Sequence, residues 1–323
     1  MKKFLAIALM LMLVLTAAAS AEVLQIGFEN SMSEPIGQGL QKWQELLAAK
    51  DVDLTIELFP DSQLGNKTDI IDQMLLGEPV MTLADGAFFA DYGVPDMGIV
   101  FGPFLFDNWD QCWKLTESDW WAEQCAKLND MGIKMVAANW AYGARHTLTT
   151  KPVNTVDDLA GLQIRVPTNQ IQTKGFEVLG ATPVGMSLGD VYTALQQGTI
   201  DGLENPLTVL YNGAYQEVCK YLILDHHILD YTCWVCGTDF FNTLTPEQQQ
   251  ILIDAGNEAG AYNNQMLEET TNKALEDLKA AGVEVVDFDR DSFVAACESF
   301  YEDPEIKAMW SEGLIDQIKE IIK

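Results

Sequence analysis

The first part of the chain changes from alternating apolar residues to apolar residues at helical spacing and back again. Val23 to Phe28 predicts a strand, and residues 36–49 then carry apolar side chains on one helical face. Leu54, Ile56 and Leu58 alternate as a second strand. Because a strand, a helix and a strand in this order form a parallel pair through a right-handed crossover, the pattern indicates an α/β fold.

This order of strands and helices continues along the chain. Asn66 and Asp69 predict the capped start of a helix that stops at Gly77. Ser187 and Asp190 have the spacing of a capping box before another helix. Further strands are predicted at Val80 to Leu83, Lys134 to Trp140, Gln163 to Val166, Ile200 to Pro206, Leu229 to Asp239 and Val283 to Phe288.

Two stretches of the second half predict helices of different length. An amphipathic pattern follows Pro206 and leads to Tyr221. From Pro246 to about Ala281 the pattern is helical almost throughout, which is longer than a typical globular helix. Gly256 and Gly260 are candidate positions for bends in this long helix.

The chain opens with the features of a secretory signal peptide. Two lysines precede an apolar run over residues 4–17, and residues 19–21 are small. The run is too short for a stable membrane span. We predict a signal peptide of residues 1–21, cleaved near Ala21, and hence a location in the periplasm. The rest of the chain exceeds what one hydrophobic core usually organises, so we expect two lobes.

The composition is strongly acidic and poor in histidine. The chain has 19 lysines and arginines against 48 acids, a formal charge of −29 at pH 7. Such a surface repels nucleic acid and anionic lipid, so we expect no nucleic-acid partner, and a site for an acidic ligand must concentrate the few arginines. With three histidines and no Gly-x-Ser-x-Gly, phosphate-loop or zinc motif, we expect neither an enzyme nor a cofactor or metal.

The six cysteines leave their redox state open. In an exported chain they can pair, but a protein of this length does not need disulfides. Cys233 and Cys236 form a Cys-x-x-Cys motif, with two histidines upstream. In a strand this spacing points the two thiols to opposite faces, which suits neither zinc nor a redox pair.

Two polar residues lie at the ends of predicted strands in the middle of the chain. Arg165 lies near the carboxyl end of strand 163–166, which Pro167 closes. Ligands of open α/β sheets bind beyond such ends, and a guanidinium can bind a carboxylate through two parallel hydrogen bonds. The alternative is an arginine in a structural salt bridge. Asn205 ends another strand, where it can contact a ligand or simply form a turn.

Further candidates follow other predicted strands. Glu29 comes directly after the first strand, and Asp85 is a candidate contact for a ligand hydroxyl or amine, or else a helix-capping acid. Trp140 and Tyr142 can line a pocket or fill the core. Arg145 is a second arginine placed after a strand, and its alternative is a surface arginine.

The segment 158–206 resembles the solute-binding subunits of tripartite ATP-independent periplasmic (TRAP) transporters, the DctP family. The shared motifs are Gly-Leu-x-Ile-Arg-Val-Pro, Ala-Leu-Gln-x-Gly and Asp-Gly-x-Glu-Asn-Pro, in this order. Similar motifs of the family occur at residues 59–65, 103–106, 143–145 and 217–222. The similarity covers nearly the whole chain after the leader.

The resemblance implies a two-lobed periplasmic binding protein fold, similar to type II, with a hinge and a long helix that spans both lobes. It also implies that Arg165 and Arg145 share a ligand carboxylate, and that Asn205 fixes a carboxylate oxygen or a neighbouring hydroxyl. The expected partners are a small organic acid and the membrane subunits of a TRAP transporter, and we expect a monomer. We assign residues 22–142 plus 231–270 to lobe I and residues 143–230 plus 271–323 to lobe II.

The identity of the acid is a preference among several classes. Arg145 and Asp85, with Trp140 nearby, favour a hydroxylated acid such as a uronate or another sugar acid. Phe88 stands where some sialic-acid-binding relatives have a third arginine, and Leu188 stands where an aromatic residue is sometimes found, which disfavours sialic acid. The alternatives are a dicarboxylate, a keto acid or an aromatic acid, and a receptor that serves a sensor or an ATP-driven importer.

Overall fold

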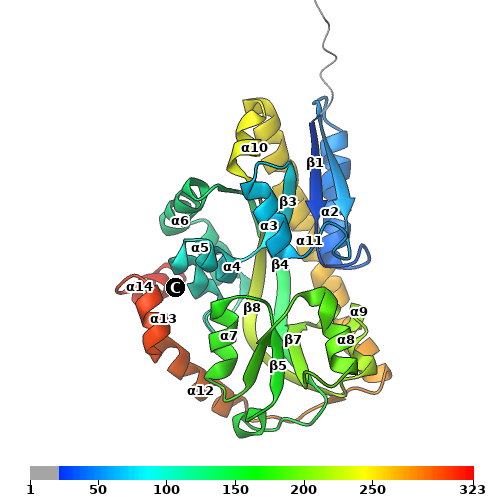
Figure 1. Ribbon diagram of the computed structural model, residues 1–323, viewed down its shortest axis with the longest axis vertical. Helices are drawn as coiled ribbons and strands as arrows, with labels where there is room; N and C mark the ends of the chain where they lie inside the picture. Colours follow the sequence, from blue (N-terminus) through cyan, green and yellow to red (C-terminus); the bar gives the residue numbers. More distant parts are fainter. Residues whose placement is uncertain (1–21) are drawn as a thin grey trace, which may run out of the picture.

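The computed structural model describes residues 22–323, which form one mixed sheet flanked by helices (Figure 1). The predicted signal peptide, residues 1–21, lies outside the described residues. The strand order is β2-β1-β3-β8-β4-β7-β5-β6, and β9 pairs with β8. The strands are β1 (Glu22–Gly27), β2 (Leu54–Phe59), β3 (Val80–Ala84), β4 (Ile133–Thr149), β5 (Gln163–Val166), β6 (Thr182–Gly185), β7 (Gly202–Pro206), β8 (Tyr221–Gly237) and β9 (Glu284–Val285).

Two long antiparallel strands, β4 and β8, run through the middle of the sheet and join its two halves (Figure 1). Each has 17 residues. In one half β3 pairs with β8, and β1 and β2 continue outwards, with the parallel β1–β2 pairing that the sequence predicted. In the other half β7 pairs with β4, and β5 and β6 continue outwards. Two lobes that share two strands confirm the predicted two-lobed α/β fold.

Helices cover the sheet in both lobes. The α-helices are α2 (Pro35–Ala48), α3 (Lys67–Leu75), α4 (Gly86–Asp91), α5 (Trp109–Thr116), α6 (Asp119–Asp130), α7 (Gln170–Glu177), α8 (Val191–Gln196), α9 (Leu207–Asn212), α10 (Thr238–Thr243), α11 (Pro246–Ala280), α12 (Arg290–Glu302), α13 (Pro304–Met309) and α14 (Leu314–Ile321). Short 3₁₀ helices are η1 (Pro95–Phe101), η2 (Val156–Leu159), η3 (Leu188–Asp190) and η4 (Tyr215–Glu217). Over residues 22–323 no helix combines the length and the apolar character that a membrane crossing requires.

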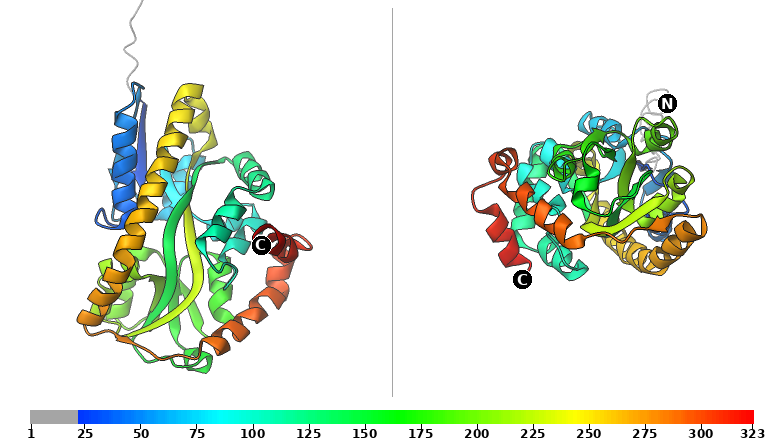
Figure 2. Two further views of the ribbon diagram at one scale, coloured as in Figure 1. Left: turned by 180° about the vertical axis from the view of Figure 1, so that it is seen from behind. Right: turned by 90° about the horizontal axis from the view of Figure 1, so that it is seen from below.

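The long helix α11 extends along both lobes and packs on α2 and β4 (Figure 2). Thr245 and Gln248 form a capping box at its start. It is one continuous helix of 35 residues, so Gly256 and Gly260 do not interrupt it. A Cβ atom at Gly256 would lie 2.5 Å from the ring of Trp43. The glycines therefore allow the helix to approach a core of tryptophan side chains.

The strand β4 is longer than the sequence predicted. It continues past Trp140 to Thr149, so Arg145 lies inside a strand and not after one. Its pairing with β8 has several register shifts, one of them between Ala141 and Gly143, and such irregularities bend a strand without ending it. Gly143 has a φ of 137°, which side-chain-bearing residues rarely adopt.

Three other local predictions were wrong. The segment after β7 does not form one helix leading to Tyr221, because α9 ends at Asn212, and β8 already begins at Tyr221 and not at Leu229. Ser187 and Asp190 do not form a capping box. The Ser187 hydroxyl instead donates to the Asp190 carboxylate at 2.6 Å.

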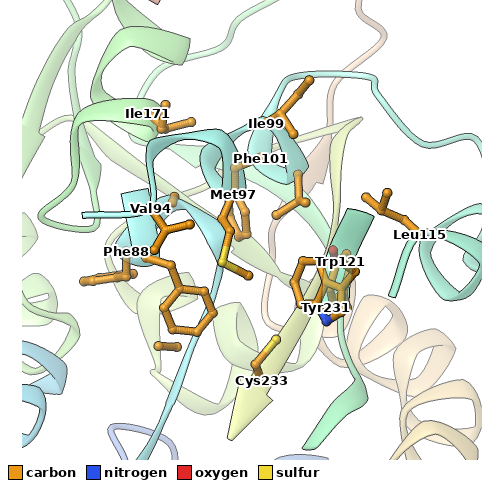
Figure 3. Packing of buried hydrophobic residues seen from close by; sticks show 14 of the residues in the cluster. Phe88, Val94, Met97, Ile99, Phe101, Leu115, Trp121, Ile171, Tyr231 and Cys233 are labelled. Carbon is orange, nitrogen blue, oxygen red and sulfur yellow. The ribbon is translucent and has the colours of Figure 1, made fainter. Parts of the chain in front are cut away.

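A hydrophobic cluster lies on one face of β8 (Figure 3). It joins the end of the chain to earlier helices. Tyr231 and Cys233 of β8 pack there with Trp121 of α6. The same cluster contains Phe300 of α12 and Ile318 of α14. The exact lobe boundaries stay a prediction, but part of the C-terminal segment assigned to lobe II packs on helices assigned to lobe I.

The six cysteines, all within the described residues, are free thiols. Cys233 and Cys236 are both buried, and they belong to clusters on opposite faces of β8. This confirms the expected opposite orientation of the two side chains in a strand.

Candidate functional site

A cavity lies between the two lobes, where strand ends from both halves of the sheet meet. Its inner part has a volume of about 30 Å³, which is room for a water molecule or two. A wider space of about 360 Å³ adjoins it, and Arg165 lines both. The inner part is lined by six of the candidate residues, namely Glu29, Asp85, Arg145, Arg165, Leu188 and Asn205.

Arg165 is a buried cation that has no carboxylate partner within residues 22–323. Its Nε and Nη2 donate to the carbonyl oxygen of Met186 at 3.0 and 2.7 Å. Nη1 of Arg165 makes no hydrogen bond to any residue from 22 to 323. Burial lowers the pKa of Arg165, an effect that the negative charge of Glu29 opposes. Arg165 is 3% exposed and lines the cavity, so its guanidinium is available to an anion that enters there.

Asn205 places a buried amide oxygen at the end of β7. The residue is 2% exposed, and its Oδ1 has no hydrogen-bond partner in the described part of the chain. A buried acceptor that is left unpaired costs about 1 to 3 kcal/mol. A ligand that donates a hydrogen bond to this oxygen would remove that cost.

Arg145 lines the same cavity but is already paired with two acids. Its Nε and Nη2 donate to the carboxylate of Glu204, with 2.7 Å between Nη2 and Oε1. Its Nη1 donates to Oδ2 of Asp230 at 2.6 Å. Burial alone would lower the pKa of Arg145, but the two carboxylates raise it above its ordinary value. Any ligand that contacts Arg145 has to share it with Glu204 and Asp230.

A row of buried charged side chains continues from Glu204 away from Arg145. Nε2 of His227 lies 3.3 Å from Oε2 of Glu204, and Nδ1 lies 3.2 Å from Oδ2 of Asp225. Burial would lower the pKa of His227, but the two carboxylates raise it to about 9. Burial would likewise raise the pKa of Glu204 and of Asp225, yet the nearby cations hold both below their usual range. At neutral pH negative and positive side chains therefore alternate along this row, in the order Asp225, His227, Glu204 and Arg145.

Asp85 fits both alternatives that the sequence left open. Its Oδ1 accepts from the backbone N–H groups of Ala87 and Phe88 at 2.9 and 3.3 Å, so it caps α4. It also lines the cavity, where Nζ of Lys67 lies 3.8 Å from its Oδ2. Burial raises the pKa of Asp85, and Lys67 opposes the shift. Phe88 lines the wider outer space, and Lys67 lies 4.2 Å from its ring centroid.

Glu29 and Leu188 form a contact across the two lobes. The backbone N–H of Leu188, at the start of η3, donates to Oε1 of Glu29 at 3.2 Å. Both residues line the inner cavity. The contact therefore links two segments of the cavity wall that lie far apart in the sequence.

The structure does not bring Trp140 to the cavity. Trp140 is fully buried with Trp43 and Trp234, at ring-centroid distances of 5.9 and 5.2 Å. Its Nε1 donates to a carbonyl of α11. Tyr142 lines the cavity instead, and its hydroxyl accepts from Nδ2 of Asn30 at 3.0 Å.

Sequence reasoning missed three charged residues of the cavity region. Asp230 lines the inner cavity, and the signal for it was an acid within an otherwise apolar predicted strand. Glu204 directly precedes Asn205 in a motif that we had singled out. Lys67 sits at the start of a helix, and nothing in the pattern distinguishes it from a surface lysine.

Two α/β lobes that share long strands and meet over a buried arginine define the class of two-lobed solute receptors. The chain belongs to bacterial extracellular solute-binding protein family 7, the DctP family, whose family model matches residues 26–307. This confirms the family that the motifs around Arg165 predicted.

Individual relatives agree with this assignment. The 2,3-diketo-L-gulonate-binding periplasmic protein YiaO of Escherichia coli K12 is 33% identical over 295 residues, which is 90% of this chain and 89% of that protein. The TRAP periplasmic solute-binding protein from Ochrobacterium anthropi, solved with bound L-fuconate, is 40% identical with a TM-score of 0.89, covering 94% of this chain and 100% of that one. The TRAP protein from Actinobacillus succinogenes 130z, solved with bound L-galactonate, is 37% identical with a TM-score of 0.88, covering 93% and 99%. The chain is thus a TRAP-type solute-binding protein.

Proposed function

We propose that this protein is a periplasmic receptor that binds a sugar acid between its lobes and delivers it to the membrane subunits of a TRAP transporter. The observation that carries the proposal is Arg165, a buried guanidinium without a carboxylate partner among residues 22–323. A ligand carboxylate at Arg165 forms charge-assisted hydrogen bonds, each worth about 1.5 to 3 kcal/mol. The buried oxygen of Asn205 then accepts from a neighbouring ligand hydroxyl.

Three of the relatives with the highest identity agree on one chemical class of ligand, although DctP of Rhodobacter capsulatus, 30% identical, is named for C4-dicarboxylates. The three described above are named for, or bound to, 2,3-diketo-L-gulonate, L-fuconate and L-galactonate. All three are six-carbon sugar acids, so an open-chain sugar acid is our first choice and a uronate our second. The acceptors and donors of the cavity, Asp85 and Arg145 among them, suit a hydroxylated acid better than an aromatic one.

Binding requires the lobes to separate and close again. The inner cavity of about 30 Å³ is several times too small for a six-carbon acid. The connecting strands β4 and β8 pair irregularly between the lobes, where hinge motion is easiest. The acid binds first to Arg165 in the opened protein, and the contact between Glu29 and Leu188 forms again on closure.

The cellular role follows from the family. The leader expected in residues 1–21, together with the periplasmic relatives, supports a periplasmic location. That the receptor works as a monomer stays an expectation. As a receptor it releases its ligand chemically unchanged, whereas an enzyme would convert it. Recovery of the bound acid by mass spectrometry distinguishes the two.

The proposal is tested by thermal shifts of the mature protein, unfolded and refolded to remove any carried ligand. The panel contains L-galactonate, L-fuconate, D-galacturonate, succinate, pyruvate and benzoate. A ligand at one hundred times its Kd stabilises the protein by about 2.7 kcal/mol. We expect a raised midpoint with the sugar acids and none with benzoate. A shift confined to succinate or pyruvate would contradict the proposed ligand class, and a folded protein that responds to no acid would contradict the receptor.

A further inference from the structure

The cavity contains an unpaired acceptor as well as an unpaired cation. Asp230 of β8 is 3% exposed and lines the inner cavity. Its Oδ2 accepts from Nη1 of Arg145 at 2.6 Å, whereas its Oδ1 is buried and finds no hydrogen-bond partner among residues 22–323. A buried carboxylate oxygen is rarely left without a donor, so this part of the cavity is incomplete without one.

A second acid lies on the same cavity but is already satisfied. Asp85 uses its Oδ1 to cap α4, and Lys67 lies near its Oδ2. Burial raises the pKa of Asp230 to about 7, Arg145 opposes this shift, and the negative charge of Asp85 adds to it. Of the two acids, Asp230 is therefore the one whose carboxylate is stabilised most by a hydrogen bond from a ligand hydroxyl.

We propose that Asp230 determines the specificity of this receptor: its Oδ1 accepts a hydrogen bond from a ligand hydroxyl, and its charge, with that of Asp85, excludes a second carboxylate. The inference rests on the proposed function, in which Arg165 binds the carboxylate of a sugar acid. The protein then selects polyhydroxy monocarboxylates over diacids with the same carbon skeleton.

The selectivity follows from the charges on the cavity. A diacid brings a second negative charge toward two buried acids, and like charges at a desolvated interface cost several kcal/mol. Arg145 cannot offset that cost, because its single positive charge is already shared between the carboxylates of Glu204 and Asp230. Since each 1.4 kcal/mol is tenfold in affinity, we expect the diacid to bind about 100-fold more weakly than the monoacid.

Isothermal titration with matched pairs of acids tests this inference. The pairs are L-galactonate and galactarate, D-gluconate and D-glucarate, and D-mannonate and D-mannarate, which differ only in the oxidation of carbon 6. Asp230→Asn keeps the shape of the side chain and removes its charge. We therefore expect the ratio of the affinity for the monoacid to the affinity for the diacid to decrease by about tenfold or more. Asp96→Asn is the matched control, because Asp96 is also a buried acid but its carboxylate accepts from the backbone N–H and the hydroxyl of Ser311, away from the cavity, and it should keep the wild-type ratio.

The outcomes separate this inference from the proposed function. Equal affinity of the wild-type protein for both members of a pair overturns the inference and leaves the receptor for sugar acids standing. An unchanged ratio in folded Asp230→Asn also overturns the role of Asp230. Failure of the wild-type protein to bind any of these six acids, and also L-fuconate and D-galacturonate of the thermal-shift panel, overturns both. If Asp230→Asn does not fold, the ratio of the wild-type protein's affinities for the monoacid and the diacid still tests the predicted selectivity.

Discussion

Two buried arginines line the same cavity, yet their surroundings differ. Arg145 is held by the carboxylates of Glu204 and Asp230, which raise its pKa against the effect of burial. Arg165, equally buried at 3% exposure, donates within residues 22–323 only to the carbonyl of Met186, and burial lowers its pKa. Burial and position are alike, so the difference lies in the partners.

This difference separates two roles that residue type alone does not. A buried arginine with two carboxylates is electrically satisfied, and its removal leaves uncompensated acids behind. A buried arginine without a carboxylate is satisfied only when an anion arrives. We therefore expect Arg165 to dominate affinity and Arg145 to dominate stability.

The largest expected effect is the loss of binding in Arg165→Met, which keeps most of the side-chain volume. Two charge-assisted hydrogen bonds of about 1.5 to 3 kcal/mol each correspond to roughly 100- to 10,000-fold in Kd. Titration with the best acid of the thermal-shift panel measures the loss. Arg165→Lys keeps the charge but loses the planar pair of donors. Its affinity for the acid should therefore lie between those of the wild-type protein and Arg165→Met. Normal affinity in Arg165→Met would refute the assignment of this arginine.

The second effect is on stability. Arg145→Met leaves Glu204 and Asp230 buried without their cation, and we expect a loss of about 3 to 5 kcal/mol in the free energy of unfolding. Urea unfolding of the ligand-free protein measures it. Arg165→Met serves as the matched control and should lose much less. Equal losses in the two variants would remove the distinction between the two arginines.

A smaller effect is expected at Asn205, which lies on the cavity beside both arginines. Asn205→Ala removes the buried oxygen that lacks a partner in the structure described, so the ligand-free protein should not be destabilised through that atom. Affinity for the acid should fall by about tenfold, since one hydrogen bond is worth about 0.5 to 1.5 kcal/mol. Titration and thermal unfolding of the same sample measure the two quantities. Unchanged affinity would show that the ligand does not use this amide.

The features that were predicted correctly, strand ends and a helix cap, depend on residues that are close together in the sequence. Arg165 and Asn205 lie where the strands predicted around them end, because Pro167 and Pro206 stop those strands within a few residues. The capping pair Asn66 and Asp69 likewise forms from adjacent residues. These features need no distant partner, so the pattern alone was sufficient for them.

What the sequence did not predict depends on distant pairing. The length of β4 follows from its ladder with β8, whose residues are far away in the chain. The pairing of Arg145 with Asp230 likewise joins residues 85 positions apart. Trp140 and Tyr142 are two residues apart in β4, and a regular strand places such side chains on one face. The pattern therefore does not tell that Trp140 packs against α11 while Tyr142 lines the cavity.

The smallest expected effect is a pH dependence that arises on the Arg145 side. His227, with its pKa raised to about 9, keeps a proton between about pH 6.5 and 9 that the unfolded chain has lost. Stability therefore falls as the pH rises through this window. Asp230, raised to about 7, acts in the same direction at its lower end, while His226, lowered to about 4, acts in the opposite direction only below pH 6.5.

Thermal unfolding of the ligand-free protein between pH 6.5 and 9 measures this dependence. We expect the midpoint to fall steadily in the wild-type protein and in Arg165→Met, whose substitution leaves His227 and its two acids in place. In His227→Gln the midpoint should be lower and should fall less steeply with pH, because the group that titrates across the whole window is gone and Asp230 acts only at its lower end. A midpoint that stays constant or rises from pH 6.5 to 9 in the wild-type protein would mean that His227 is not held protonated by Glu204 and Asp225. The contrast between a charge-paired arginine and an unpaired one would then have to rest on the two substitutions alone.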